Sequence, residues 1–309
     1  MTRVGVVDLG TNSTRLLVAD VEDGHVHEIE RRITITKLGE GVDGGRRLVP
    51  QAVERVYACL ADYRNRIDRH SPELQLAYAT SAVRDAVNGE GFLDEIESRF
   101  GLPTRLLSGD EEALLTFGGV AAGRELADPT AIVDIGGGST EIVLGSSAGI
   151  SFHTSLDFGC VRLSERFTLP EAGGLPDVPT LLEHVGTLLD ETVPRELRPA
   201  EGIGTAGTVT TLGTLHLGLP EEDPAALHGH RLPASWIETA AQRLAATPVA
   251  ELLRRPGIAP ERAAVIAAGA LALAEIVRFF DLGELEVSEN DVLHGVALEA
   301  ALLDAARDA

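Results

Sequence analysis

One segment of the chain occurs twice, and this repeat constrains the fold more than any other feature. Residues 7–18 read VDLGTNSTRLLV and residues 133–144 read VDIGGGSTEIVL, aligned without a gap at an offset of 126 residues. In each copy an aliphatic run ends in an aspartate, a glycine-centred turn follows, and a second aliphatic run begins. Such a pattern predicts a β-hairpin with a carboxylate at the end of its first strand. A chain of 309 residues is also long for a single core, so two domains are expected.

The turn of each predicted hairpin carries groups suited to binding phosphate. Glycine at positions 10 and 136 allows a tight turn with no Cβ in the way of a ligand. Successive backbone N–H groups, with serine and threonine hydroxyls beside them, form an anion nest. Asp8 and Asp134 would meet a bound phosphate through a metal ion or water, because a bare carboxylate repels it. The residues of the two predicted nests are Gly10, Thr11, Asn12 and Ser13, and Gly136, Gly137, Gly138 and Ser139.

A third glycine-rich segment, GIGTAGTVTTL at residues 202–212, leads into a helix-like pattern. A turn at the start of a helix offers free N–H groups and the positive end of the helix dipole. A plain connecting loop with Gly207 at a cap is the alternative for this segment taken alone. The chain has no GxxxxGK[ST] loop, so P-loop chemistry is excluded. The candidate phosphate ligands of the third segment are Gly204, Thr205, Gly207 and Thr208.

Four motifs follow one another along the chain: TSAVRDAVN at 80–88, LSGDEEALLTFGGV at 107–120, DIGGGSTEIV at 134–143 and GTAGTVTTL at 204–212. In this order they resemble the exopolyphosphatase/guanosine pentaphosphate phosphatase (Ppx/GppA) family, in its short, two-domain form. Two such hairpins before a Gly-Thr-rich loop also look like the actin, hexokinase and chaperone ATPase superfold. The resemblance implies an α/β protein with two RNase H-like (actin-like ATPase) domains flanking an interdomain cleft.

The expected first domain spans residues 1–123 and the expected second domain spans residues 124–289. The final helix, residues 290–309, is expected to pack on the first domain, as the superfold implies. The closing segment VSENDVLHGVAL departs from the family's usual pattern, which has an arginine where His294 lies.

The resemblance also assigns a catalytic base. On its own, the segment SGDEEALL at 108–115 is typical of a helix start with acids in the first turn. In the family the base is the glutamate before the small residue of the EEA motif, which corresponds to Glu112. Glu111 is the alternative if the register is off by one. The base would orient and deprotonate a water that attacks the terminal phosphorus.

Asp134 and Glu141 bracket the second hairpin, and the resemblance implies that both serve catalysis and bind metal, with Asp8 contributing from the first hairpin. Hard carboxylate oxygens suit Mg²⁺ or Mn²⁺. Arg15 stands in the first copy where Glu141 stands in the second. One hairpin is therefore expected to supply a cation for the substrate and the other a carboxylate for metal and water. The resemblance makes Arg84 a further phosphate ligand.

Charge and composition limit the classes of partner that are expected. The net charge of −22 argues against non-specific binding to nucleic acid or to anionic membranes. Lys37 is the only lysine, and the arginines supply bidentate phosphate contacts for a local basic site. Two distant cysteines, no signal-peptide pattern and no apolar run of about 20 residues predict a soluble, cytoplasmic protein.

The function expected from the resemblance is that of an exopolyphosphatase, which releases orthophosphate from the end of inorganic polyphosphate with Mg²⁺. A guanosine pentaphosphate (pppGpp) phosphohydrolase is the nearest alternative, with guanosine penta- or tetraphosphate as its partner. A nucleotide-dependent kinase or chaperone-like switch belongs to another class, and the EEA segment argues against it. A catalytically inactive polyphosphate or alarmone sensor is a fourth hypothesis. A homodimer is compatible with this class, although the sequence identifies no interface.

Overall fold

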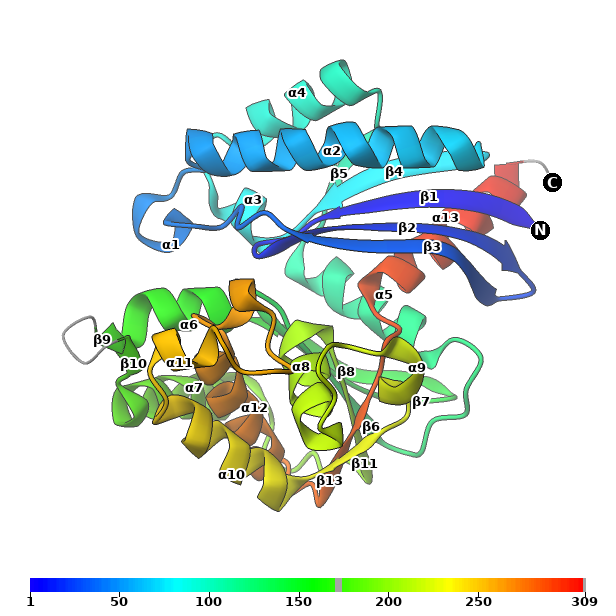
Figure 1. Ribbon diagram of the computed structural model, residues 1–309. Helices are drawn as coiled ribbons and strands as arrows, with labels where there is room; N and C mark the ends of the chain where they lie inside the picture. The colour runs from blue at the N-terminus through cyan, green and yellow to red at the C-terminus, as the bar shows by residue number, and fades with distance from the viewer. Residues whose placement is uncertain (170–173, 308–309) are drawn as a thin grey trace. The chain divides into compact units, whose positions relative to one another are not determined.

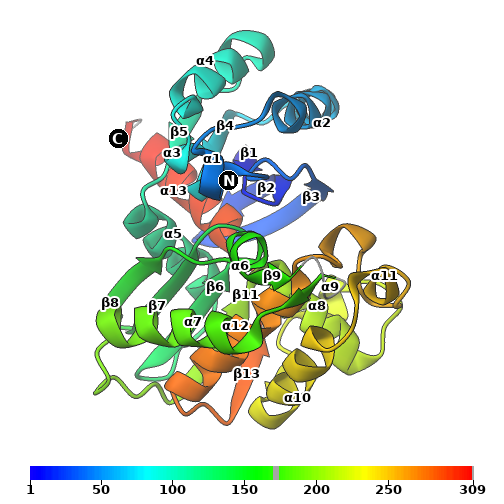
Figure 2. The ribbon, with the colours of Figure 1, turned by 90° about the vertical axis from the view of Figure 1, so that its left-hand side faces the viewer.

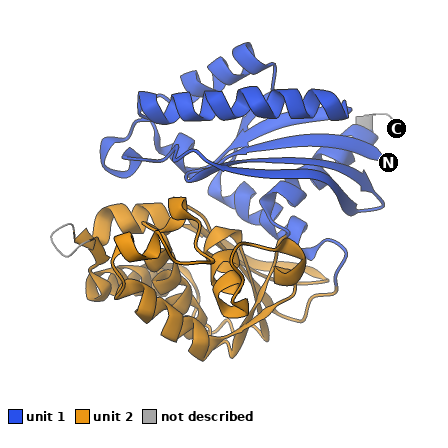
Figure 3. Ribbon diagram, viewed as in Figure 1, with its two compact units in different colours: residues 1–124, 290–309 blue, residues 125–289 orange. Residues whose placement is uncertain are grey.

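A computed structural model describes residues 1–169 and 174–307. The chain divides into two compact units, residues 1–124 with 290–309 and residues 125–289 (Figure 3). Residues 170–173 of the expected second domain and residues 308–309 of the expected final helix lie outside the described residues. Each unit has a sheet of its own.

The first unit contains β1 (Thr2–Leu9), β2 (Ser13–Glu22), β3 (His25–Ile35), α1 (Val42–Gly45), α2 (Pro50–His70), β4 (Leu74–Ala79), α3 (Ser81–Asp85), α4 (Gly89–Phe100), β5 (Thr104–Leu106), α5 (Gly109–Ala121) and α13 (Val292–Arg307). Its sheet has the order β3-β2-β1-β4-β5. The first three strands are antiparallel, and β4 and β5 run parallel to β1.

Helices cover both faces of this sheet. α2 and α4 lie on one face, and α5 and α13 lie on the other (Figure 1). In α2 the residues Val56, Leu60, Tyr63 and Ile67 are buried, which is the helical spacing of an apolar stripe against a sheet. α13 belongs to this unit although some 170 residues separate it from α5, and the two helices pack against one another.

The second unit contains β6 (Thr130–Ile135), β7 (Thr140–Ser146), β8 (Gly149–Leu156), α6 (Cys160–Phe167), β9 (Thr168–Leu169), β10 (Leu175–Pro176), α7 (Val178–Thr192), β11 (Glu201–Thr205), α8 (Ala206–Leu217), α9 (Pro224–Leu227), β12 (Arg231–Pro233), α10 (Ala234–Ala245), α11 (Val249–Leu252), the 3₁₀ turn η2 (Pro260–Arg262), α12 (Ile266–Phe279) and β13 (Glu284–Val287). Its main sheet has the order β8-β7-β6-β11-β13-β12. α7, α12 and α10 lie side by side over this sheet (Figure 2).

The repeated sequence corresponds to a repeated topology. The strands β8-β7-β6-β11-β13 follow the same order as β3-β2-β1-β4-β5, and both sets combine an antiparallel three-strand meander with two parallel strands. Within the six-stranded sheet, only the antiparallel edge strand β12 is additional, and β9 and β10 form a separate two-stranded sheet. The predicted α/β class with two RNase H-like units is thereby confirmed. No helix among the described residues combines the length and the apolar character needed to cross a bilayer.

Candidate active site

The first repeated hairpin joins β1 to β2, and its register places Asp8 opposite Arg15. Opposite residues of an antiparallel pair project from the same face of the sheet, so the two side chains meet. The Nε of Arg15 donates to Oδ2 of Asp8 at 2.6 Å, and Asp8 is only 3% exposed. An internal cation therefore offsets the charge of this buried carboxylate.

The turn of this hairpin leaves backbone donors available. The N–H of Gly10 donates to the carbonyl of Ser13 at 3.0 Å and closes the turn. The carbonyls of Thr11 and Asn12 accept bonds from residues 36–39, which hold the turn from outside. Within the described residues, no hydrogen bond uses the N–H groups of Thr11 and Asn12. The turn thus has the adjoining N–H groups that an anion nest requires.

The second repeated hairpin joins β6 to β7, and its register places Asp134 opposite Glu141. Both side chains are buried, and the hydroxyl of Ser155 on β8 donates to Oε1 of Glu141 at 2.7 Å. Two carboxylates that project from the same face of neighbouring strands repel one another unless a cation or a proton offsets them. Mg²⁺ is commonly held by one or two carboxylates while it keeps several waters. This donor set therefore fits a hydrated divalent cation.

Helix α6 fixes the turn of the second hairpin. The N–H groups of Cys160 and Val161 donate to the carbonyls of Gly136 and Gly137 at 3.0 and 2.9 Å. The contact is close, because a Cβ at Gly159 would lie 2.5 Å from the carbonyl carbon of Gly137. These bonds turn the carbonyls of the glycine run toward α6. Hydrogen bonds within the described residues do not use the N–H groups of Gly137 and Gly138, which are therefore available to an anion.

The third glycine-rich segment connects β11 to α8. The hydroxyl of Thr205 donates to the carbonyl of Ser288 at 3.1 Å, which ties the end of β11 to the end of β13. Ala206 adopts a left-handed conformation with φ of 68°, which is uncommon for a residue with a Cβ. The guanidinium of Arg262 lies over Gly207, where a Cβ would come within 1.8 Å of Nη1. Gly207 is therefore required for the close approach of a cation to this turn.

The proposed base Glu112 lies in the first turn of α5. The helix begins with a capping box, in which the Ser108 side chain accepts from the Glu111 N–H and the Glu111 side chain accepts from the Ser108 N–H. Glu112 is buried, and its Oε2 lies 3.5 Å from Nη1 of Arg84. The same nitrogen of Arg84 donates to the carbonyl of Leu107 at 2.8 Å. The structure thus brings together two residues that the sequence selected from separate motifs.

The environments of Glu111 and Glu112 distinguish the two candidate bases. Glu111 accepts hydrogen bonds from Arg105 and from both the N–H and the hydroxyl of Ser108. These bonds, that of Arg105 first, lower the pKa of Glu111 to about 2. A carboxylate with so low a pKa is a weak proton acceptor, and its oxygens already have structural partners. The geometry favours Glu112 as the base.

Comparisons with known proteins identify the family of this chain. The model of the Ppx/GppA phosphatase family matches residues 17–303. The chain belongs to the Ppx/GppA phosphatase family. Exopolyphosphatase 2 of Mycobacterium tuberculosis is 38% identical, with 97% of this chain and 99% of that protein covered. The crystal structure of the Aquifex aeolicus member of the Ppx/GppA family has a TM-score of 0.80 at 28% identity, over 98% of both chains. An exopolyphosphatase from Cytophaga hutchinsonii has a TM-score of 0.86 at 25% identity, over 96% of this chain and 98% of that one.

Three residues that sequence reasoning missed contact the candidate site residues of this Ppx/GppA phosphatase. Arg262 lies at the third glycine segment, and Arg162 of α6 donates through Nε to the carbonyl of Gly138 at 2.8 Å. Asp291, just before α13, forms ion pairs with Arg15 and with Arg31. No sequence motif indicated these contacts, because each contact joins residues that are far apart in the chain. The one available hint was the departure from the family pattern around His294.

The carboxylates around Arg15 have opposite pKa shifts in this phosphatase. Burial raises the pKa of Asp8, and the attraction of Arg15 only partly opposes it. Burial also acts to raise the pKa of Asp291, but Arg15, the hydrogen bond with His294 and Arg31 together hold that pKa far below its usual range. Asp291 is therefore the permanent anion of the cluster, whereas Asp8 is the carboxylate with an unmet demand for positive charge.

No preformed cluster of three or more His, Cys, Asp or Glu side chains able to hold a metal ion occurs in the described part of the chain. Mg²⁺ does not require one, because it is commonly bound by one or two carboxylates while water and phosphate oxygens complete its coordination. Asp134 and Glu141 fit this use. Oδ1 of Asp8 also fits it, since this buried oxygen has no hydrogen-bond partner within the described residues.

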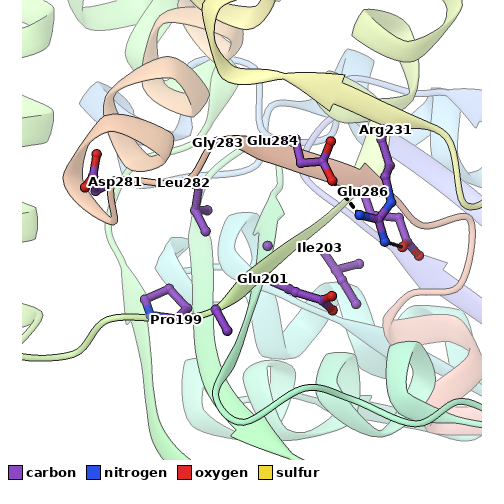
Figure 4. A pocket seen from close by; sticks show the side chains of 11 residues that line it. Pro199, Glu201, Ile203, Arg231, Asp281, Leu282, Gly283, Glu284 and Glu286 are labelled. Atoms are coloured by element: carbon purple, nitrogen blue, oxygen red, sulfur yellow. Dashed lines mark hydrogen bonds and ion pairs between the residues drawn. The ribbon is translucent and has the colours of Figure 1, made fainter.

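A pocket of about 270 Å³ in the second unit is lined by none of these groups (Figure 4). It is formed at the amino ends of β11 and β13, whereas Asp134 and Thr205 lie at the carboxyl ends of β6 and β11. Its lining is acidic, and its one arginine, Arg231, is paired with Glu284 and Glu286. A polyanionic substrate would be repelled there, and the carboxyl ends of parallel strands are the usual binding edge of such sheets.

Proposed function

We propose that this chain is an exopolyphosphatase, which hydrolyses the terminal phosphoanhydride bond of inorganic polyphosphate and releases orthophosphate. Membership of the Ppx/GppA phosphatases supports a phosphoanhydride hydrolase. The relative named exopolyphosphatase 2, which aligns over 97% of this chain, supports polyphosphate as the substrate.

The surroundings of Glu112 support this proposal most directly. Glu112 is a buried carboxylate beside Arg84, on a helix whose N-terminus is already capped by the reciprocal hydrogen bonds of Ser108 and Glu111. The carboxylate of Glu112 therefore does not cap the helix. The guanidinium of Arg84 beside it suits a site that binds phosphate. This combination matches what hydrolysis of a terminal phosphate requires: a base for water next to a phosphate ligand.

The proposed reaction is a single transfer of the terminal phosphoryl group to water. Glu112 accepts a proton from a water molecule while the water oxygen forms a bond to the terminal phosphorus. The bond between that phosphorus and its bridging oxygen breaks, and the shortened polyphosphate leaves with the bond electrons. Arg84 and the free N–H groups of the two hairpin turns hold the phosphate oxygens and stabilise the charge that develops on them. No covalent enzyme intermediate is required.

A divalent cation has a defined place in this scheme. Asp134 and Glu141 would hold Mg²⁺ or Mn²⁺, with Asp8 as a further carboxylate. When bound, the ion neutralises phosphate charge and orients the phosphate chain.

The test compares orthophosphate release from long-chain polyphosphate, pppGpp and ATP, each with Mg²⁺ and with EDTA. The proposal predicts that kcat/KM is highest for polyphosphate and that EDTA abolishes release. Faster release from pppGpp would favour the guanosine pentaphosphate phosphohydrolase, which the family name supports as the second candidate. Release from none of the three, with saturable binding of ATP, would favour a nucleotide-dependent switch instead.

We also propose the cytoplasm as the location. Cys59 and Cys160 are both buried as free thiols, which is typical of proteins that remain in a reducing compartment.

A further inference from the structure

The guanidinium of Arg15 contacts its two carboxylate partners unequally. Nε and Nη2 both approach the same oxygen of Asp8, Oδ2, at 2.6 Å. Nη1 instead donates to Oδ2 of Asp291. The other oxygen of Asp8, Oδ1, is buried and has no hydrogen-bond partner in the described part of the chain.

This arrangement differs from the usual geometry of such a pair. An arginine that faces a single carboxylate commonly forms a fork, with two parallel N–H···O bonds to the two oxygens. Asp8 and Arg15 lie opposite each other and are close enough for that fork. Nη1 bonds to Asp291 instead, so the guanidinium is held between two carboxylates, and Nε and Nη2 meet only one oxygen of Asp8.

Asp291 is itself held from several directions. Its Oδ1 accepts the N–H of Leu293 at 2.8 Å, which caps the start of α13. Its Oδ2 lies 3.5 Å from Nη2 of Arg31 on β3. The side chain of Asp291 is only 1% exposed, so it cannot move with Arg15.

A closed ring of charged residues links α13 to β3. Arg31 lies 3.7 Å from Glu28, and Glu28 lies 2.9 Å from Nε2 of His294. The ring closes at Nδ1 of His294, which accepts the N–H of Asp291 at 3.2 Å. His294 therefore braces the helix start against the edge strand of the sheet.

The helix start is also fixed against α5. A Cβ at Gly119 would lie 2.0 Å from the carbonyl oxygen of Asp291, and a Cβ at Gly295 would lie 1.9 Å from the carbonyl oxygen of Leu115. Both glycines are needed for the two backbones to approach this closely. The position of Asp291 is thus set by the helix that carries Glu112.

We propose that Asp291, braced by His294, is a positioning residue that confines Arg15 to one oxygen of Asp8 and so keeps the other oxygen for the divalent cation. The purpose assigned to Oδ1 rests on the proposed function, whereas the confinement of Arg15 does not. In the absence of Asp291, Arg15 would close onto both oxygens of Asp8.

The first test is a crystal structure of the full chain with Asp291→Asn. Asparagine is a good N-cap, so this change removes the charge and retains the cap of α13. The expected result is a fork in which Arg15 engages both Oδ1 and Oδ2 of Asp8. If Arg15 still contacts Oδ2 alone, the proposal is wrong. Asp291→Ser, which also retains a capping side chain, serves as the second variant if the first does not fold.

The second test is a double-mutant cycle of Asp291→Asn with Arg15→Gln, read out as kcat and KM for orthophosphate release from polyphosphate. Partners that orient a metal ligand typically cost 10–100-fold when altered. We expect Asp291→Asn to lower kcat by roughly 10-fold or more. In the Arg15→Gln background, where no guanidinium can close on Asp8, the same change should alter kcat by less than about twofold.

If Asp291 only stabilised the start of α13, the pattern would differ. Asp291→Asn would then lower kcat by the same factor in the wild-type and the Arg15→Gln backgrounds. Equal factors would therefore overturn the proposal. Glu299→Gln is the matched control, since Glu299 forms an ion pair with Arg105 elsewhere on α13. If no variant and no wild-type protein releases orthophosphate, the proposed function fails, and the crystal structure still decides the position of Arg15.

Discussion

At the residue scale, the two repeated hairpins share a register and differ in one residue that changes their chemistry. Asp8 faces a cation, whereas its counterpart Asp134 faces the carboxylate of Glu141. The attraction of Arg15 partly offsets the burial of Asp8, whereas Asp134 and Glu141 repel one another when both are ionised. The same backbone therefore places an aspartate opposite an arginine in one unit and opposite a second carboxylate in the other.

This difference predicts the behaviour of Glu141→Gln. The variant removes one of two facing carboxylates, while the amide oxygen still accepts the hydrogen bond from Ser155. We expect a higher melting temperature than wild type in EDTA, a smaller rise on adding Mg²⁺, and a large loss of orthophosphate release. Thermal unfolding with and without Mg²⁺ measures the first two effects. A variant less stable than wild type in EDTA would contradict the account of this pair.

At the scale of elements, the packing of α5 on α13 depends on glycines without room for a side chain. Gly295→Ala would place a Cβ 1.9 Å from the carbonyl oxygen of Leu115, so the two helices must separate. Overpacking of this kind costs about 1–3 kcal/mol. Gly118→Ala in α5 is the control, because a Cβ there meets nothing within 4 Å and alanine favours the helix. Urea unfolding should show a loss of stability for the first and none for the second.

The brace between α13 and β3 predicts a pH dependence of stability. Burial alone would lower the pKa of His294, but hydrogen bonds with Asp291 and Glu28 outweigh it and raise that pKa. Arg31, the remaining charge of the ring, partly opposes this rise. When Nδ1 of His294 is protonated, it can no longer accept the backbone N–H of Asp291. It then faces Oδ1 of Asp291, which lies 3.5 Å away.

Because the folded pKa lies above the unfolded value of about 6.5, this stabilisation is fully present below pH 6.5 and is lost as the pH rises through the folded pKa. We expect the stability difference between wild type and His294→Gln to shrink over that range. Urea midpoints of both proteins, measured from pH 5.5 to 9, give the difference directly. A difference that grows with pH would show that the neutral imidazole is the stabilising form.

The sequence predicted those features that depend on local pattern. The duplicated hairpins predicted two α/β units, and the structure places the aligned residues Arg15 and Glu141 opposite the two aspartates. The sequence did not predict contacts between residues that are far apart in the chain. Asp291 reaches Arg15 across 276 residues, and only the packing of α13 against α5 brings them together. Arg262 likewise lies in the 3₁₀ turn before α12, and only the folded chain brings its guanidinium over Gly207.

At the scale of the whole molecule, the net charge of −22 opposes the approach of a polyanion. The proposed function therefore depends on local features: free N–H groups in two turns, arginines beside them, and a divalent cation. The residues proposed for these tasks are divided between the two units, with Glu112 and Arg84 in one and Asp134 and Glu141 in the other. Neither unit alone carries the full set, so hydrolysis is expected to require the whole chain.

The central claim is that Glu112 is the base for water in an exopolyphosphatase. The most direct measurement is kcat for orthophosphate release from polyphosphate with Mg²⁺, in wild type, Glu112→Gln and Glu111→Gln. Loss of a general base costs about 10²–10⁴-fold, so Glu112→Gln should fall by at least roughly 100-fold. Glu111→Gln, which can still form the capping box, should keep kcat within about 10-fold of wild type. Full activity of Glu112→Gln, or a larger loss in Glu111→Gln, would contradict the assignment.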